Sequence, residues 1–149
     1  MEKYLNMILL EYRYPIVNSL MLSNGELFIL EYPSFNQQKV RILCQSTIES
    51  YFKYNDEDDT TSFDILTKYE NEDYQAFVGE GSMGSDGIIY LIRKSDKKLL
   101  WFLFLDNSNP FIKVSIQDDK IVAFNSKEQK WILPISNPQN ISIERKSLK

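Results

Sequence analysis

The stretch that decides the fold is Leu99-Leu100-Trp101-Phe102-Leu103-Phe104-Leu105. All of its residues are apolar, so it has no polar face to turn toward water. A strand with this pattern is typical of the centre of a sheet that is covered on both sides. The stretch therefore predicts a central β-strand with further strands on either side of it.

Strand-like runs separated by turn residues precede and follow this stretch. The predicted strands of this half are residues 73–78, 87–93, 99–105, 111–116, 121–124 and 131–133. Their regular spacing is typical of antiparallel β-structure. Pro134 either ends the last strand or places it at a sheet edge. Trp101 and Trp131 lie in two of these apolar strands, so we expect both in the core and not as sugar-binding platforms.

The first half predicts a mixture of strands and helices. Ser23-Asn24-Gly25 lies between two apolar runs and predicts a hairpin with a type I′ turn, because Asn and Gly accept positive φ angles. Ser46-Thr47-Ile48-Glu49 is a capping box that predicts a short helix over 46–54. Residues 2–13 fit either a helix or a strand, and we favour a helix. Two further strands are expected at 39–44 and, at a sheet edge, at 63–69.

Together these signals predict a single domain over residues 1–149. The expected class is α+β, mostly β, with an antiparallel meander sheet of about seven to nine strands and one or two short helices in the N-terminal half. We expect residues 55–62 to form an acidic loop and the polar tail 144–149 to fray. There is no export signal and no apolar run near the roughly 20 residues of a membrane helix, so we expect a cytoplasmic protein without membrane contact.

The composition excludes several kinds of active site. The chain contains no histidine, which removes every Ser-His or Cys-His nucleophilic pair and every zinc site that uses histidine. Its single cysteine, Cys44, excludes an internal disulfide, and its apolar neighbours predict a buried, unreactive thiol. We expect no cofactor, no metal ion and no enzyme activity, with a hydrolase that uses two carboxylates alone as an alternative.

The run Gly79-Glu80-Gly81-Ser82-Met83-Gly84 matches the GxGxxG pattern of nucleotide-binding loops. That pattern binds phosphate where a helix begins directly after the glycines. Here a β-branched strand follows, and the acids Glu80 and Asp86 would repel a phosphate group. We therefore expect the glycines to supply positive φ angles in a tight connection between two strands. Whether this connection is a recognition loop or only a turn stays open.

Charge is distributed unevenly along the chain. The net charge is −4, yet residues 55–86 hold ten acids against the single base Lys68. Residues 1–54 are neutral, and residues 87–149 carry an excess of bases. We do not expect an acidic protein of this kind to bind nucleic acid directly.

Three interpretations of the acidic segment are open. The segment lacks the central glycine and the final glutamate of an EF-hand, which disfavours calcium binding. The plain interpretation is a solvated charged loop. The third is an anionic surface that docks on a basic partner, and the tyrosines among the acids favour it because tyrosine is a common interface residue.

A family likeness lies within residues 79–135. It is carried by Gly79-Glu80-Gly81-Ser82-x-Gly84-Ser85-Asp86-Gly87, then by Leu100-Trp101, and then by Asp106-Asn107-Ser108-Asn109-Pro110-Phe111. This pattern resembles small bacterial proteins that are encoded beside polymorphic toxins, and it is similar to an immunity protein of the SUKH type. The resemblance implies a non-enzymatic inhibitor that binds one toxin.

The acidic segment suits such a partner, because toxins that attack nucleic acid need positive charge to approach phosphates. We therefore expect an immunity protein that neutralises a basic, nuclease-like toxin through an acidic, tyrosine-rich surface. The expected partner-binding residues are Asp56, Glu57, Asp58, Asp59, Tyr69, Glu70, Glu72, Asp73, Tyr74, Glu80 and Asp86. The alternative function is a small ligand-binding or structural β domain whose acidic loop is only solvated.

Overall fold

The computed structural model describes residues 1–32 and 39–144, which form two α-helices and twelve β-strands. The helices are α1 (Glu2–Glu11) and α2 (Ile48–Tyr54). The strands are β1 (Arg13–Pro15), β2 (Ser19–Leu22), β3 (Glu26–Glu31), β4 (Arg41–Thr47), β5 (Thr60–Glu70), β6 (Tyr74–Gly81), β7 (Gly87–Arg93), β8 (Lys98–Leu105), β9 (Phe111–Gln117), β10 (Lys120–Asn125), β11 (Lys130–Pro134) and β12 (Ser142–Glu144). The predicted α+β, mostly β class is confirmed.

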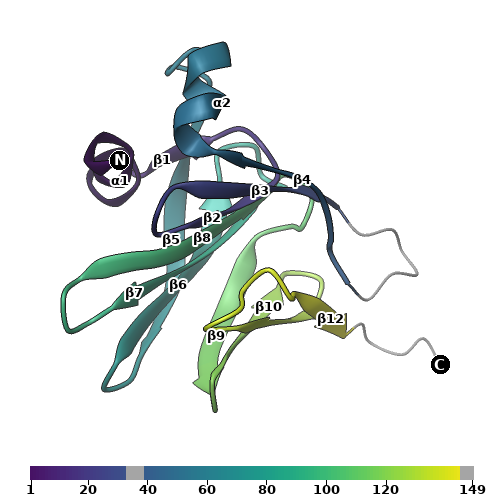
Figure 1. The fold of residues 1–149 in the computed structure, drawn as a ribbon. Coiled ribbons are helices and arrows are strands. Elements are labelled where there is room, and N and C mark those ends of the chain that lie inside the picture. Colours follow the sequence, from purple (N-terminus) through teal and green to yellow (C-terminus); the bar gives the residue numbers. More distant parts are fainter. Residues whose placement is uncertain (33–38, 145–149) are drawn as a thin grey trace.

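Eight of the strands form one curled antiparallel sheet (Figure 1). Their order is β1-β5-β6-β7-β8-β2-β3-β4, so β8 lies inside the sheet between β7 and β2. This confirms the central position predicted for residues 99–105. The meander from β5 to β8 follows chain order, whereas β2 joins it from the first part of the chain, with Ser19 paired to Phe104.

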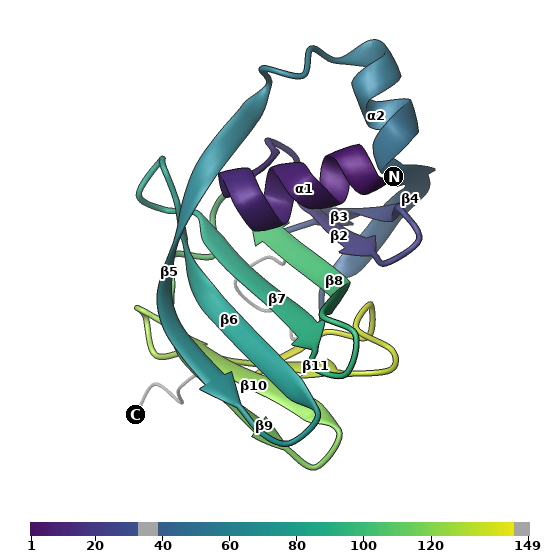
Figure 2. The ribbon, with the colours of Figure 1, turned by 90° about the vertical axis from the view of Figure 1, so that its left-hand side faces the viewer.

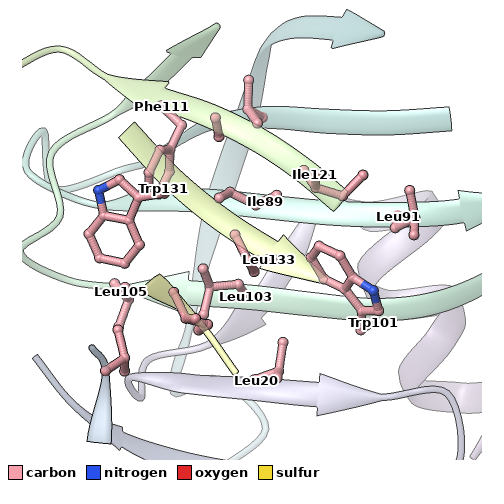
Figure 3. Packing of buried hydrophobic residues seen from close by; sticks show 14 of the residues in the cluster. Leu20, Ile89, Leu91, Trp101, Leu103, Leu105, Phe111, Ile121, Trp131 and Leu133 are labelled. Atoms are coloured by element: carbon pink, nitrogen blue, oxygen red, sulfur yellow. The ribbon is translucent and has the colours of Figure 1, made fainter. Parts of the chain in front are cut away.

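The other four strands form a second antiparallel sheet in the order β12-β11-β10-β9. It packs on one face of the eight-stranded sheet, and a buried cluster of apolar side chains fills the space between them (Figure 3). Trp101 and Trp131 are both buried there, as predicted. Pro134 ends β11, which lies between β10 and β12 and not at an edge. The turn pattern in the sequence does not predict this separate second layer.

Helix α1 packs on the opposite face of the eight-stranded sheet (Figure 2). It confirms the helix favoured for residues 2–13 as far as Glu11, whereas Arg13 already begins β1. A second buried cluster lies on this face, with Met7 and Ile8 from α1 and Ile48 from the start of α2. The rings of Tyr14 and Phe102 stack in it, with their centroids 4.3 Å apart. Because both faces of the central strand are covered, β8 needs no polar side.

Two local predictions are right about the element and wrong about its details. Strands β2 and β3 form the predicted hairpin, but Gly25 alone among its turn residues has a positive φ, 91°. Its amide donates to the carbonyl of Leu22 at 3.0 Å, so the turn is not type I′. Helix α2 begins at Ile48, two residues later than predicted, because Thr47 and not Ser46 is the cap and accepts the amide of Ser50 at 3.0 Å.

Three further predictions need correction. Cys44 is exposed and not buried, because β4 is the last strand in the sheet order and its residues are mostly open to solvent. The predicted loop 55–62 is too long, since β5 already begins at Thr60. Glu144, expected in the frayed tail, belongs to β12, and residues 145–149 lie outside the described residues.

The glycines of the GxGxxG run are explained more by close packing than by backbone angles. Of these glycines, Gly84 has a positive φ, 83°, while the others have ordinary angles. Gly79 lies in β6, where a Cβ atom would come within 1.8 Å of the carbonyl oxygen of Asp64. A Cβ on Gly81 would come within 2.4 Å of Oδ2 of Asp86. The predicted reason, positive φ at every glycine, is therefore wrong for most of them.

Candidate functional site

The structure divides the predicted partner-binding residues into two groups at opposite ends of the β5–β6 hairpin (Figure 2). Strand β5 contains 11 residues, and a strand of that length spans about 30 Å. The first group, the acidic end, contains Asp56, Glu57, Asp58, Asp59, Glu80 and Asp86. The second group, the hairpin tip, contains Tyr69, Glu70, Glu72, Asp73 and Tyr74. The acidic segment of the sequence thus forms two surfaces and not one.

Hydrogen bonds fix the loop between α2 and β5. The carboxylate of Asp56 accepts the amide of Asp58 at 2.9 Å, and its carbonyl accepts the amide of Asp59 at 2.9 Å. The carbonyl of Asp59 accepts the amide of Ile16 at 3.3 Å, which ties the loop to the end of β1. All four acids of residues 56–59 are exposed. The loop therefore holds its carboxylates toward solvent in a defined conformation.

The loop of residues 82–86, between β6 and β7, completes the acidic end. The hydroxyl oxygens of Thr61 and Ser82 lie 2.6 Å apart, which joins the start of β5 to this loop. In the register of β5 and β6, Glu80 lies directly opposite Asp64. The two loops and these two acids consequently share one end of the sheet.

Asp86 differs from the other predicted acids because its side chain is only 1% exposed. Its Oδ2 accepts the amide of Met83 at 3.3 Å and so supports the loop from beneath. Burial raises the pKa of the Asp86 carboxyl, and the hydrogen bond from Met83 opposes that rise. In this structure Asp86 positions the loop, and its carboxylate is not available to a partner.

Most carboxylates of the acidic end have no basic neighbour. Lys3 pairs with Glu57, and this contact raises the pKa of the Lys3 ammonium group. Within residues 1–32 and 39–144 no ion pair involves Asp56, Asp58, Asp59, Asp64 or Glu80. Clustered charges of one sign produce a field that attracts an oppositely charged partner. The acidic end therefore presents a cluster of carboxylates of which only Glu57 is in an ion pair within the described chain.

Two exposed apolar side chains lie within the acidic end. Met83, in the loop of residues 82–86, is 75% exposed, and Ile16, next to Asp59, is 53% exposed. Neither belongs to the set expected from the sequence. For Met83 a signal existed, namely an apolar side chain inside a run of Gly, Ser and Asp. Ile16 had no such signal, because only the pairing of β1 with β5 brings it here.

At the hairpin tip one acid, Glu70, has a basic partner, whereas Glu72 and Asp73 are in no ion pair within residues 1–32 and 39–144. Glu70 accepts a hydrogen bond from Gln75 at 2.9 Å and lies 3.8 Å from Nζ of Lys94. Both contacts lower the pKa of the Glu70 carboxyl. The side chain of Asn71 accepts the amide of Asp73 at 2.9 Å and so organises the turn. The tip has the features of a stabilised hairpin end.

The two tyrosines expected to provide contact area belong to the hairpin tip. Tyr74 is partly buried and packs against the cluster between the two sheets, while Tyr69 is 39% exposed. Both lie at the opposite end of the β5–β6 hairpin from Asp58 and Asp59. The structure therefore separates the predicted tyrosines from the acids of residues 56–59.

Comparison with known proteins gives no family assignment: no family model matches the chain, and neither does any curated protein or solved structure. In the described part of the chain, no group of three or more Cys, Asp or Glu side chains is placed to hold a metal ion. Neither α1 nor α2, the helices of residues 1–32 and 39–144, is long and apolar enough to cross a membrane.

Proposed function

We propose that this protein is an immunity protein, a non-enzymatic inhibitor that binds a basic toxin through its acidic end. The observation that carries the proposal is the combination of unpaired carboxylates with the exposed side chains of Met83 and Ile16. The carboxylates attract a cationic partner and raise the association rate, while the apolar side chains supply area that is buried on contact. The resemblance found in residues 79–135 supports this, because it includes the loop that carries Met83.

A toxin that attacks nucleic acid fits this surface chemically. Such a protein presents lysine and arginine side chains where phosphates bind. A surface of aspartates and glutamates covers those side chains and blocks the substrate from the same positions. The chemistry at the acidic end also favours binding over catalysis, since the chain contains no histidine and its one cysteine lies on β4, at the opposite edge of the sheet.

The partner is identified by co-purification of the tagged protein from its native host at low and at high salt. We expect a stoichiometric basic protein that is lost at high salt, and we expect co-expression of this chain to suppress its toxicity. A partner-free preparation from cells that produce the toxin, or a captured protein whose toxicity persists on co-expression, would contradict the proposal.

Two matched variants then locate the surface. Asp58→Asn with Asp59→Asn removes two charges from the acidic end, and Glu72→Gln with Asp73→Asn removes two charges from the hairpin tip. We expect the first pair to slow association on the order of tenfold at low salt and to reduce its salt dependence, with little effect of the second pair. The reverse order of effects in a stopped-flow measurement would assign binding to the tip.

Met83→Ala separates apolar contact from charge. We expect it to leave the association rate unchanged and to accelerate dissociation, because a buried apolar anchor acts after the encounter. Unchanged dissociation of the partner from this variant would exclude Met83 from the interface.

A further inference from the structure

The face of the eight-stranded sheet that carries α1 contains a groove past the end of that helix. Helix α1 crosses one part of the face, and β5, β6 and β7 extend beyond it (Figure 2). The groove has a volume of about 380 Å³, within the range of roughly 300–1,000 Å³ that is typical of small-molecule sites. Leu9 and Tyr12 line it from the helix side, and Ile65 lines it from β5.

The floor of the groove is built from aromatic side chains. Phe77 of β6 and Tyr90 of β7 are partners in the strand register, and their rings stack with centroids 4.7 Å apart and planes 12° apart. Tyr90 also stacks on Phe102 of β8 at 5.1 Å and 14°. Three neighbouring strands thus hold these rings in place, and a preformed aromatic floor favours an aromatic ligand.

The hydroxyl group of Tyr90 is free to bind a ligand. Tyr90 lines the groove, and its hydroxyl makes no hydrogen bond to any residue of the described ranges. Its oxygen is not among the buried polar atoms that lack a partner, so it is open to water in the groove. A ligand with an acceptor atom in the groove would satisfy this hydroxyl.

Two lysines make the rim of the groove positive. Lys94 lines it with its Nζ 3.0 Å from the carbonyl of Asn71 and 3.8 Å from Glu70, so its charge is partly engaged. Lys97 lines it from the turn between β7 and β8, is exposed, and has no ion pair within the described chain. An anionic group on the ligand is therefore the complement of this rim.

We propose that the groove binds a small aromatic carboxylate, with its ring against Phe77 and Tyr90 and its carboxylate toward Lys97. The hydroxyl of Tyr90 donates a hydrogen bond to an oxygen of the ligand. This site uses other residues than the acidic end, and binding of a small molecule to the isolated protein is measured without any toxin. Its test is therefore independent of the proposed immunity function.

The experiment is calorimetric titration of the protein with 2-naphthoate and with 2-naphthamide, which has the same rings and no charge. We expect 2-naphthoate to bind and 2-naphthamide to bind about tenfold more weakly, with the difference shrinking at high salt. Equal affinities would overturn the assignment of a carboxylate, and absence of naphthoate binding at millimolar concentration would overturn the site.

Conservative variants assign the residues. Tyr90→Phe keeps the stacked ring and removes the hydroxyl, and we expect it to weaken naphthoate binding about tenfold. Lys97→Gln should weaken it about fivefold, while Lys98→Gln, which removes a neighbouring charge whose residue does not line the groove, should leave it unchanged. Equal effects of the two lysine variants, or none from Tyr90→Phe, would contradict the proposed contacts. Circular dichroism of each variant verifies that it is folded.

Discussion

The hydroxyl oxygens of Thr61 and Ser82 lie 2.6 Å apart and join the first residues of β5 to the loop that follows β6. Thr61 is 4% exposed, and its Oγ1 also accepts the amide of Ser82 at 3.3 Å. Through this contact the loop that carries Met83 keeps its position beside the loop of residues 55–59. The acidic end depends on it as a structural unit.

Thr61→Val retains the shape of the side chain and removes its hydroxyl. We expect the free energy of unfolding to fall by about 1 kcal/mol, because the buried Thr61 loses its hydrogen bonds with the hydroxyl and the amide of Ser82, whose own side chain can still bind water. Urea denaturation measures the change, and Ser62→Ala, at an exposed neighbouring position, is the control. Equal losses for the two variants would show that the hydroxyl pair contributes nothing.

Asp86 gives the protein a defined pH dependence. Burial raises the pKa of its carboxyl in the folded protein, so the unfolded chain releases this proton at lower pH than the folded one. The contribution of Asp86 to stability is therefore greatest below the ordinary carboxyl pKa of about 3.9, and this contribution falls as the pH rises through the raised value.

Asp86→Asn cannot ionise and keeps an acceptor for the amide of Met83. We expect this variant to be more stable than the wild type near neutral pH, with a difference that vanishes in acid. Thermal denaturation over a pH series measures the difference in stability. The Asp64→Asn variant is the control for a general effect of removing one negative charge from this end of the sheet. A less stable Asp86→Asn protein at neutral pH would mean that the ionised carboxylate is the favoured form.

Trp101 and Trp131 occupy the same cluster but differ in their hydrogen bonding. Nε1 of Trp101 donates to the carbonyl of Ile135 at 3.2 Å, whereas Nε1 of Trp131 is buried without a partner in the described chain. Trp101→Phe should therefore cost about 1 kcal/mol more than Trp131→Phe, since both remove a similar volume and only the first breaks a bond. Urea denaturation followed by circular dichroism compares them. An equal loss of unfolding free energy in the two variants would show that the hydrogen bond of Trp101 does not stabilise the protein.

Strand β4 exposes an edge of the sheet with apolar side chains. Leu43 is 51% exposed and Ile42 is 41% exposed, and β4 is the last strand in the sheet order. Exposed apolar edges promote pairing between molecules. Leu43→Lys should slow aggregation in light scattering, with a change in unfolding free energy below about 0.5 kcal/mol. Gln45→Lys adds the same charge without removing an apolar group, and an equal benefit from it would assign the effect to charge alone.

The strands from β6 to β11 lie close to where apolar runs and turn residues predict them, because those signals are local. The pairing of one strand with another, by contrast, depends on segments that are far apart in the sequence. Nothing in residues 19–22 indicates that they pair with residues 101–104, since both segments are apolar enough to pair with many others. For the same reason the sequence does not separate the strands into two layers or show that Cys44 lies on an open edge.

The candidate site was predictable in composition and not in arrangement. Counting acids finds Asp58, Asp59 and the hairpin-tip acids in one segment, but residues 60–81 form a long hairpin that separates its two ends. Ile16 reaches the acidic end through the pairing of β1 with β5, which joins distant parts of the chain. Burial of Asp86 follows from its packing over Gly81, a contact that no pattern of charges reports.

The pairing of Ser19 with Phe104 has a consequence for the order of events during synthesis. The β2–β3 hairpin leaves the ribosome early, and β8, the strand that pairs with the open edge of β2, is made only after residues 32–97 have followed. Contacts between such distant residues form slowly, because a long loop must close before they gain any stability. The nascent chain therefore carries the unpaired apolar edge of β2 until β8 emerges, and an unpaired strand edge of this kind is prone to aggregate in that interval.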